Sequence, residues 1–281
     1  MKKFLIYKIY TQPFDTELLS GIMWEFNITG LLENDDHVSV FISDIDLAVE
    51  AKLNSSLMKL KNENFIESFR VEKEILEDKN WNEEWEKSRE VIRISDRIVI
   101  KPTFKNYSAK ENEIVLTIDP KMSFGTGEHQ TTKLILQLLE DTVKPGIKVL
   151  DVGSGTGILA IASIKLGASK AVAVDSDEIC LDNCNENCSL NQVVDSVKIL
   201  TGEIDAVNEN DFDLILANIQ KNVLIEIAEK LKSRLNKNGF VILSGLLDSD
   251  FDVIRNKYYS IGFEIRRIEK EDEWIALVLG F

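Results

Sequence analysis

The sequence predicts an α/β protein with a mostly parallel sheet, preceded by a smaller α+β module. The first observation is residues 149–157, where an apolar run ends in an acid, glycines alternate with small residues, and a helical pattern begins. The second is residues 171–175, an apolar run that also ends in an acid and is typical of the next parallel strand. The third is the order β-α-β-β-α-β over residues 2–72, which matches a ferredoxin-like module.

The elements of the N-terminal module are predicted from alternation, helical spacing and turn residues. A β-rich stretch leads to a helix that Pro13 opens and Gly30 stops. The module is completed by a strand pair around an Asn-Asp-Asp turn, a second helix and a last strand. The second helix is expected at 47–62, and the strands are expected at 2–11, 31–33, 38–42 and 69–72. The expected domains are the module at 1–76, a linker helix at 77–92 and a larger domain at 93–281.

The linker is charged and mostly acidic, with Trp81 and Trp85 four residues apart on one helix face. We interpret both rings as packing against a domain, with a peptide-gripping role as the alternative. Residues 91–103 and 113–119 each predict a strand, and together they form a hairpin-like entrance to the larger domain.

The loop at 121–132 carries two glycines, several hydroxyls and a histidine ahead of a helix expected at 133–140. Thr131 or Thr132 can cap that helix. The loop is suited to fold over a bound ligand near its reactive end. His129 is a candidate base, and a hydrogen-bonding or packing role is the alternative, because a histidine alone is a weak indication of proton transfer.

The glycine-rich turn at 153–157 predicts a ligand site at the carboxyl end of a buried strand. Three glycines permit a sharp bend and a close approach of a ligand, and the amides that open the next helix are unpaired donors. A dinucleotide fingerprint needs a third glycine at position 158, which is Ile158, and the turn lacks the Gly-Lys-Ser/Thr of a P-loop. A nucleotide-like ligand is expected across this turn. A purely structural role of the glycines is the alternative.

Asp175 ends the second strand, roughly twenty residues beyond the turn, where a carboxylate can accept both hydroxyls of a ribose. The alternative is a cap on the next helix, which we assign to Asp177. The remaining pattern continues the alternation of strands and helices. Helices are expected at 158–166, 223–235 and 251–261, and strands at 196–200, 212–219, 240–244, 263–268 and 274–279.

Composition limits the class of protein. The chain of 281 residues has room for one large and one small domain, and its formal net charge is -15. That charge argues against a protein that grips nucleic acid through phosphates. It is compatible with a basic protein substrate, although solubility alone would also explain it. No apolar stretch approaches a membrane span and no signal peptide is recognised, so the expected location is the cytoplasm.

Cys180, Cys184 and Cys188 recur every four residues on one predicted helix. This stripe lacks zinc-site spacing, so we expect packing and no metal. Three cysteines in such a chain imply no disulfide framework.

The glycine turn paired with Asp175 resembles the class I S-adenosylmethionine-dependent methyltransferases over about residues 120–281. The resemblance implies a seven-stranded, mostly parallel, Rossmann-like sheet whose last strand is antiparallel. In that fold the turn after the third strand lies near the adenine, so Glu203 and Ile204 are expected contacts. Asn218 ends the fourth strand, where its amide and neighbouring carbonyls can hold a substrate amine. A simple turn role for Asn218 is the alternative.

The segments 124–132, 149–157, 217–219 and 273–277 are similar to those of the ribosomal protein L11 methyltransferase (PrmA) family. That family has a substrate-recognition domain, a linker and a methyltransferase domain. The resemblance implies N-methylation of lysines, and of an α-amine as a further target, on ribosomal protein L11. By motif, the resemblance marks Thr132 as a cofactor contact, Gly153 as the first glycine of the turn, Asp175 as the ribose carboxylate and Asn218 as the active-site asparagine. The other expected cofactor contacts are Phe124, Gly125, Gly155 and Gly157, and Asn218 is expected to contact the cofactor as well.

The chain departs from the family pattern at the cofactor loop, where Lys121, Glu128 and Gln130 replace residues common in relatives. These changes leave the carried residues in place and bear on substrate preference. Two other functions stay open: a methyltransferase of the same fold with another substrate, and a non-catalytic S-adenosylmethionine-binding protein. A nicotinamide-dependent reductase is disfavoured by Ile158.

Overall fold

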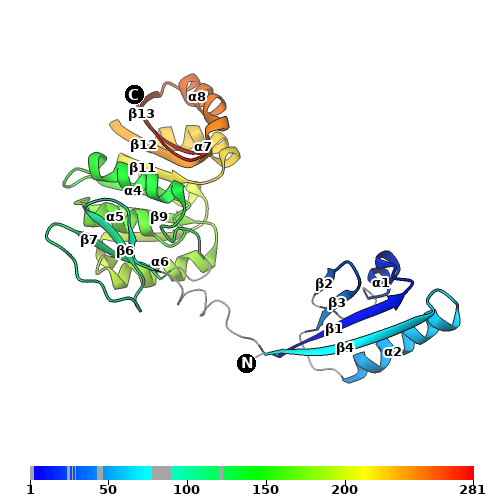
Figure 1. Ribbon diagram of the computed structural model, residues 1–281. Coiled ribbons are helices and arrows are strands. Elements are labelled where there is room, and N and C mark those ends of the chain that lie inside the picture. Colours follow the sequence, from blue (N-terminus) through cyan, green and yellow to red (C-terminus); the bar gives the residue numbers. More distant parts are fainter. Residues whose placement is uncertain are drawn as a thin grey trace. The chain divides into compact units, whose positions relative to one another are not determined.

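The computed structural model describes residues 3–23, 26, 28, 30–42, 47–77, 90–119 and 123–281. The chain divides into two compact units, Met1–Trp81 and Asn82–Phe281 (Figure 1). The predicted tryptophan pair of the linker, Trp81 and Trp85, and the departure at Lys121 lie outside the described residues. Among the described helices, none has the length and apolar character needed to cross a membrane.

The smaller unit has the expected order of elements and forms one antiparallel sheet in the order β2-β3-β1-β4. Its elements are β1 (Lys3–Gln12), α1 (Thr16–Met23), β2 (Gly30–Glu33), β3 (Val38–Ile42), α2 (Leu47–Asn62) and β4 (Ser68–Glu77). Alternate residues of β1, Leu5, Tyr7 and Ile9, join the core that both helices cover. Gly30 does not stop the first helix as expected. The helix α1 ends at Met23, and Gly30 is the first residue of β2.

The entrance to the larger unit differs from the predicted hairpin. The expected strand 91–103 is two antiparallel strands, β5 (Ile92–Arg93) and β6 (Ile98–Lys101). Ser95 causes the reversal, since its hydroxyl accepts the backbone N–H of Arg97 and of Ile98, each at 3.0 Å. The next strand, β7 (Ile114–Thr117), pairs with β6 in parallel, so the two expected strands form no hairpin.

The main sheet of the larger unit has seven strands in the order β10-β9-β8-β11-β12-β14-β13. The first five are parallel, and β14 is antiparallel to both β12 and β13, so the sheet is mixed. The strands are β8 (Lys148–Val152), β9 (Lys170–Asp175), β10 (Val197–Thr201), β11 (Phe212–Asn218), β12 (Leu235–Leu247), β13 (Glu264–Glu271) and β14 (Trp274–Gly280). The helices are α4 (Gln130–Thr142), α5 (Ile158–Lys165), α6 (Glu178–Leu190), α7 (Lys221–Arg234) and α8 (Phe251–Ser260), with single 3₁₀ turns at Val194–Ser196, Ile204–Ala206 and Asp248–Asp250.

Helices cover both faces of this sheet, and consecutive strand residues point to opposite cores. Val149 belongs to the core under α4, α5 and α6, whereas Leu150 belongs to the core under α7 and α8. The three cysteines of α6 are free and buried, which confirms the packing interpretation. Within the described part of the chain, no cluster of three or more potential ligands can hold a metal ion.

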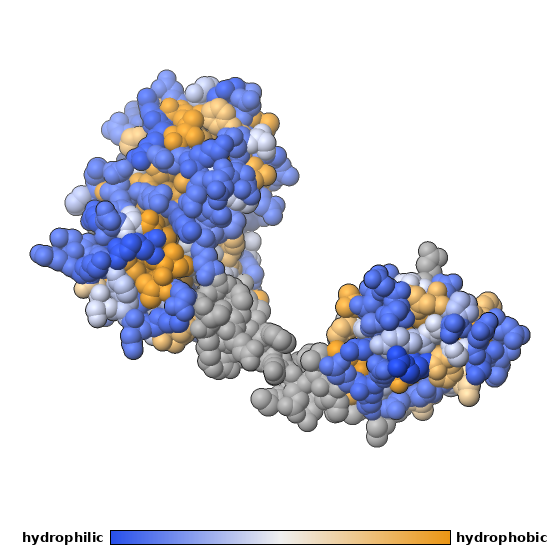
Figure 2. All heavy atoms as spheres, viewed as in Figure 1, coloured by the Kyte–Doolittle hydropathy of each residue, from blue (hydrophilic) through white to orange (hydrophobic). Residues whose placement is uncertain are grey.

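Hydrophilic residues dominate the visible face of each unit, and apolar residues gather there in small patches (Figure 2). The apolar side chains lie mainly in the cores described above. Because the first five strands run parallel, their carboxyl ends meet at one edge of the sheet, which is where the predicted site residues lie.

Candidate active site

The glycine turn after β8 is packed so closely against its neighbours that it leaves no room for side chains. Gly153, Gly155 and Gly157 all have positive φ, at 72°, 51° and 79°. A Cβ on Gly155 would lie 2.3 Å from the carbonyl oxygen of Phe124. A Cβ on Gly157 would lie 2.4 Å from Cys184 Sγ, so this glycine allows α5 and α6 to pack closely, and it is not among the residues that line the cavity at the end of the sheet.

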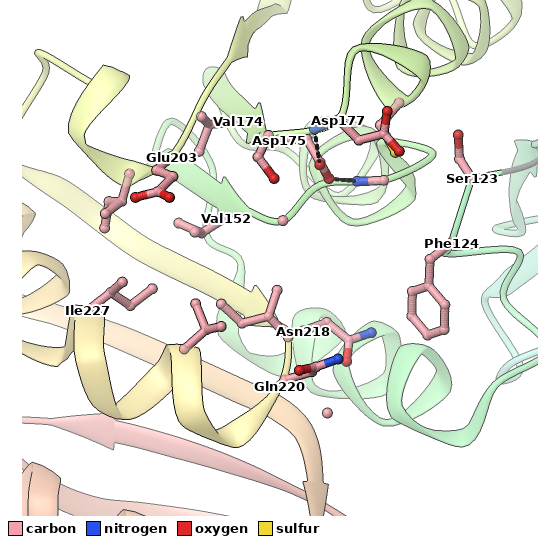
Figure 3. Close-up of a pocket in the computed structure, with 18 of the residues that line it drawn as sticks. Ser123, Phe124, Val152, Val174, Asp175, Asp177, Glu203, Asn218, Gln220 and Ile227 are labelled. Carbon is pink, nitrogen blue, oxygen red and sulfur yellow. Dashed lines mark hydrogen bonds between the residues drawn. The ribbon is translucent and has the colours of Figure 1, made fainter.

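A cavity of about 770 Å³ opens at the carboxyl edge of the sheet. Figure 3 shows Asp175 and Asp177 on one side, Asn218 and Gln220 on the opposite side, and Phe124 at one end. Most of the site residues predicted from the sequence line this cavity, namely Phe124, His129, Gly153, Gly155, Asp175, Glu203, Ile204 and Asn218. Gly125 and Thr132 do not line it.

Asp175 joins the end of β9 to the glycine turn. Its Oδ2 accepts the N–H of Gly155 at 2.8 Å, and its Oδ1 accepts the N–H of Asp177 at 3.0 Å. An ionised carboxylate has about four acceptor positions, so both oxygens keep capacity for a ligand hydroxyl. Asp177 accepts the N–H of Ile179 at 2.9 Å and caps α6, which confirms the predicted cap.

Asp151 lies beneath the turn and is fully buried. Its Oδ2 accepts the N–H of Ala160 at 3.1 Å, and its Oδ1 has no partner among the described residues. Burial, reinforced by the charge of Asp175, raises the pKa of Asp151 to about 7. Asp151 therefore holds the start of α5 to the end of β8 and titrates near neutrality.

Asn218 lines the cavity and holds an acceptor that has no partner among the described residues. Its Nδ2 donates to the Thr132 hydroxyl at 3.3 Å. Its Oδ1 is buried and has no hydrogen-bond partner in the part of the chain that the structure describes. A buried amide oxygen without a partner is costly, so a ligand N–H is its natural complement. Thr132 is itself fully buried, and its contact with Asn218 fixes which way the amide faces.

His129 caps α4 in place of the expected threonines. Its Nδ1 accepts the N–H of Thr131 at 3.3 Å and lies 2.8 Å from the Thr131 hydroxyl. Thr131 and Thr132 are instead in the buried first turn of the helix. Because Nδ1 serves as an acceptor, the neutral ring carries its proton on Nε2, which can then only donate a hydrogen bond.

Aromatic side chains surround His129 at the cavity wall. The ring of Trp274 meets it edge-on with centroids 4.7 Å apart, and the ring of Phe124 is tilted at 5.6 Å. Phe124 is 56% exposed. The histidine is therefore a packed, hydrogen-bonded element of the wall, in line with the alternative that the sequence left open.

The loop that carries Phe124 is fastened to the glycine turn through Thr156. The Thr156 N–H donates to the Phe124 carbonyl at 2.9 Å, and the Thr156 hydroxyl donates to the Gly125 carbonyl at 2.6 Å. Gly125 thus contributes through its backbone. Two of the positions that depart from the family pattern also lie in this loop. The side-chain amide of Gln130 donates to Asp272 at 3.4 Å, and the backbone N–H of Glu128 donates to the Thr126 hydroxyl at 3.3 Å.

Sequence reasoning missed several lining residues. They are Ser123, Thr131, Val152, Val174, Ser176, Asp177, Cys180, Gly202, Ile219, Gln220, Val223, Glu226, Ile227, Gly245 and Trp274. A simple signal would have found Gly202 and Gly245, because each is a glycine at the carboxyl end of a predicted parallel strand. Trp274 begins an antiparallel strand, so only the pairing of β14 with β12 brings it to this edge.

Comparison with known proteins agrees with this architecture. The model of a family described as ribosomal protein L11 methyltransferase (PrmA) matches residues 22–280. A protein named ribosomal protein L11 methyltransferase from Clostridium botulinum (strain Eklund 17B / Type B) is 34% identical over 92% of this chain and 84% of its own length. One of the same name from Acetivibrio thermocellus is 38% identical over 73% of this chain and 65% of its own length, just under two thirds.

Among solved structures, the ribosomal protein L11 methylase of Lactobacillus delbrueckii subsp. bulgaricus is 32% identical, with a TM-score of 0.65. The match covers 68% of this chain and 98% of that one. It confirms the predicted α/β methyltransferase fold, with a seven-stranded mixed sheet in this chain. The chain therefore belongs to the ribosomal protein L11 methyltransferase (PrmA) family, whose cofactor is S-adenosylmethionine.

Proposed function

We propose that this protein transfers methyl groups from S-adenosylmethionine to lysine side chains, and to an α-amino group, of ribosomal protein L11. The observation that carries the proposal is the unpartnered, buried Oδ1 of Asn218 at the wall of the cavity. An amine that presents an N–H to this oxygen is the complement that the site lacks. The family membership of the chain supplies the reaction type and the substrate class.

We assign the cofactor to the side of the cavity formed by β8, β9 and the turn after β10. A volume of about 770 Å³ lies in the range of small-molecule sites. Both oxygens of Asp175 keep acceptor capacity for the ribose hydroxyls. Gly153 and Gly155 line the cavity without a side chain, and we place the adenine beside Glu203 and Ile204, which also line it. The residues present therefore fit the group.

When bound, S-adenosylmethionine supplies an activated methyl group on a sulfonium. A lysine amine has an ordinary pKa near 10.4 and must lose a proton before its lone pair can attack. Burial of the amine beside a positive charge lowers that pKa. Asn218 Oδ1 and the backbone carbonyl of Ile219 then accept N–H bonds and aim the lone pair, which is positioning rather than proton transfer.

Water carries the released proton away in this scheme. His129 is the candidate base from the sequence, but its Nδ1 already accepts from Thr131, and its Nε2–H in the neutral ring can only donate. We therefore give His129 the role of helix cap and wall. Deprotonation of the amine is governed by how well the site excludes solvent.

We further propose that the N-terminal unit is a ferredoxin-like substrate-recognition domain at residues 1–76, joined by the linker 77–92 to the methyltransferase domain at 93–281. Ribosomal proteins that contact RNA are basic, and the net charge of -15 on this chain favours their approach. The same charge disfavours direct nucleic-acid binding by the enzyme. A ribosomal substrate implies action in the cytoplasm.

The test is incubation of the full chain with labelled S-adenosylmethionine and undermethylated ribosomes, followed by mass spectrometry of the labelled protein. We expect label on ribosomal protein L11. Label on a different protein would show that L11 is not the substrate. Cofactor binding without label on any protein would favour a non-catalytic S-adenosylmethionine-binding protein. Removal of residues 1–75 should abolish action on L11 and preserve cofactor affinity, whereas normal methylation by that variant would refute the recognition role.

A further inference from the structure

Gly245 lies at a β-bulge in the wall of the cavity. The parallel ladder of β11 and β12 ends with Asn218 opposite Ser244. On the other side of β12, Leu243 pairs with Leu277 and Leu246 with Ile275, so two residues of β12 oppose one of β14. A bulge bends its strand and re-aims the residues beyond it. Here it turns the backbone of Gly245, at φ 79°, toward the residue after Asn218.

The bulge is fastened at its base by Ser244, whose hydroxyl donates to the Ile275 carbonyl at 2.9 Å. Ser244 is fully buried. Beyond the bulge, Leu247 pairs with Trp274, which places that ring at the same cavity. The bulge therefore has a fixed position relative to the two strands on either side of it.

Gly245 packs backbone against backbone on Ile219. A Cβ at position 245 would lie 2.5 Å from the carbonyl oxygen of Ile219, 2.9 Å from its carbonyl carbon and 3.0 Å from its nitrogen. All three atoms belong to the main chain, so no side-chain rotation can relieve the contact. Any side chain at 245 must displace the Ile219 peptide or the bulge itself.

We propose that Gly245 is a positioning residue for the methyl acceptor, and this inference rests on the proposed function. The absence of a side chain lets the Ile219 backbone pack against the bulge. This packing sets the position of the adjoining Asn218 backbone, and the Thr132 hydroxyl then orients the Asn218 amide. The amine must come within about 3–3.5 Å of the methyl carbon, so a shift of the acceptor groups by a fraction of an ångström misaligns the attack. The three atoms nearest to a Cβ at position 245 all belong to Ile219, on the side of the cavity that we assign to the acceptor.

The chain offers a matched control in Gly146. Its φ is 85°, close to the 79° of Gly245, and a Cβ there would meet nothing within 4 Å. Gly146→Ala therefore introduces the cost of a left-handed alanine alone. Gly245→Ala introduces the same cost together with the collision. The difference between the two variants isolates the displacement of Ile219.

The experiment compares Gly245→Ala and Gly146→Ala in the full chain by three measurements: the dissociation constant of S-adenosylmethionine by calorimetry, single-turnover methylation of L11 at saturating acceptor, and crystal structures. We expect Gly245→Ala to shift the Ile219 carbonyl and to slow methyl transfer about 100-fold, with cofactor affinity within about threefold of the wild type. Gly146→Ala should leave the rate of methyl transfer and the position of Ile219 unchanged.

Three results would overturn the inference: an Ile219 peptide that stays in place in Gly245→Ala, a displaced peptide with a normal rate of transfer, or a loss of cofactor affinity that parallels the loss of rate. If the wild type binds the cofactor but leaves L11 unmethylated, the proposed substrate fails. The crystal structures still decide, in that case, whether Gly245 sets the position of Ile219.

Discussion

Replacement of Asp175 by alanine tests the cofactor site most directly. The side chain accepts one backbone N–H on each oxygen, from Gly155 at 2.8 Å and from Asp177 at 3.0 Å. The variant therefore loses two kinds of contact at once. It loses the acceptor positions left for two ribose hydroxyls, and it loses the brace that holds the glycine turn in the shape that receives the ligand.

The expected magnitude comes from the hydrogen bonds to a charged acceptor. Each contributes about 1.5–3 kcal/mol, so two ribose bonds contribute at least about 3 kcal/mol to binding. Since about 1.4 kcal/mol is a factor of ten, the dissociation constant of S-adenosylmethionine should rise at least about 100-fold. Loss of the backbone hydrogen bonds that Asp175 accepts should weaken cofactor binding further.

Calorimetric titration of S-adenosylmethionine into the variant measures this change. Asp213→Ala is the matched control, because Asp213 also accepts a backbone N–H, from Lys148 at 2.8 Å, but lies near the amino-terminal end of β11. That variant should lose stability and keep cofactor affinity. An Asp175→Ala variant that folds and binds the cofactor as tightly as the wild type would falsify the ribose assignment.

Three further predictions concern the opposite side of the cavity and the buried acid. Asn218→Ala should reduce the single-turnover rate of methyl transfer about 100-fold while cofactor affinity holds within about threefold, and an unchanged rate would reject its active-site role. His129→Ala should lose roughly 1 kcal/mol of stability with the helix cap, and His129→Asn should lose much less, because Asn is a good N-cap. A His129 variant that folds well but loses one limb of the pH–rate profile would show that His129 is the base after all. Because the folded-state pKa of Asp151 is raised to about 7 from 3.8, the folded state holds its proton longer than the unfolded chain, so this group lowers stability as pH rises from about 4 to 7. Urea titrations should show that Asp151→Asn removes that decline, by roughly 4 kcal/mol at most, and parallel curves for the two proteins would contradict the shift.

The sequence predicted the larger unit well where local signals and tertiary structure agree. The glycine turn, the acid at the end of β9 and the helix cap at Asp177 are each encoded within a few residues, and each lies where it was expected. The cysteine stripe of α6 was equally predictable, since a spacing of four residues keeps side chains on one helix face.

Predictions were wrong where one side chain redirects the backbone. Ser95 splits an apolar run into two strands through two backbone hydrogen bonds, and periodicity does not register a reversal of this kind. His129 displaced the threonines as the cap of α4 because a histidine ring can accept an N–H as they can. Trp274 reaches the cavity only through the pairing of β14 with β12, which is a long-range property of the sheet.

The strand order explains why variants should separate cofactor affinity from turnover. The chain leaves β8 toward β9 and β10 on one side, then returns to place β11 and β12 on the other, and the cavity opens at this switch point. In the proposed arrangement, residues after β9 and β10 bind the cofactor, and residues after β11 and β12 bind the methyl acceptor. Gly153 is at the boundary, because its N–H donates to the Val174 carbonyl at 2.9 Å while a Cβ there would collide with Ile219 at 2.3 Å. A side chain at 153 should therefore impair both cofactor affinity and methyl transfer, unlike changes at Asp175 or Gly245.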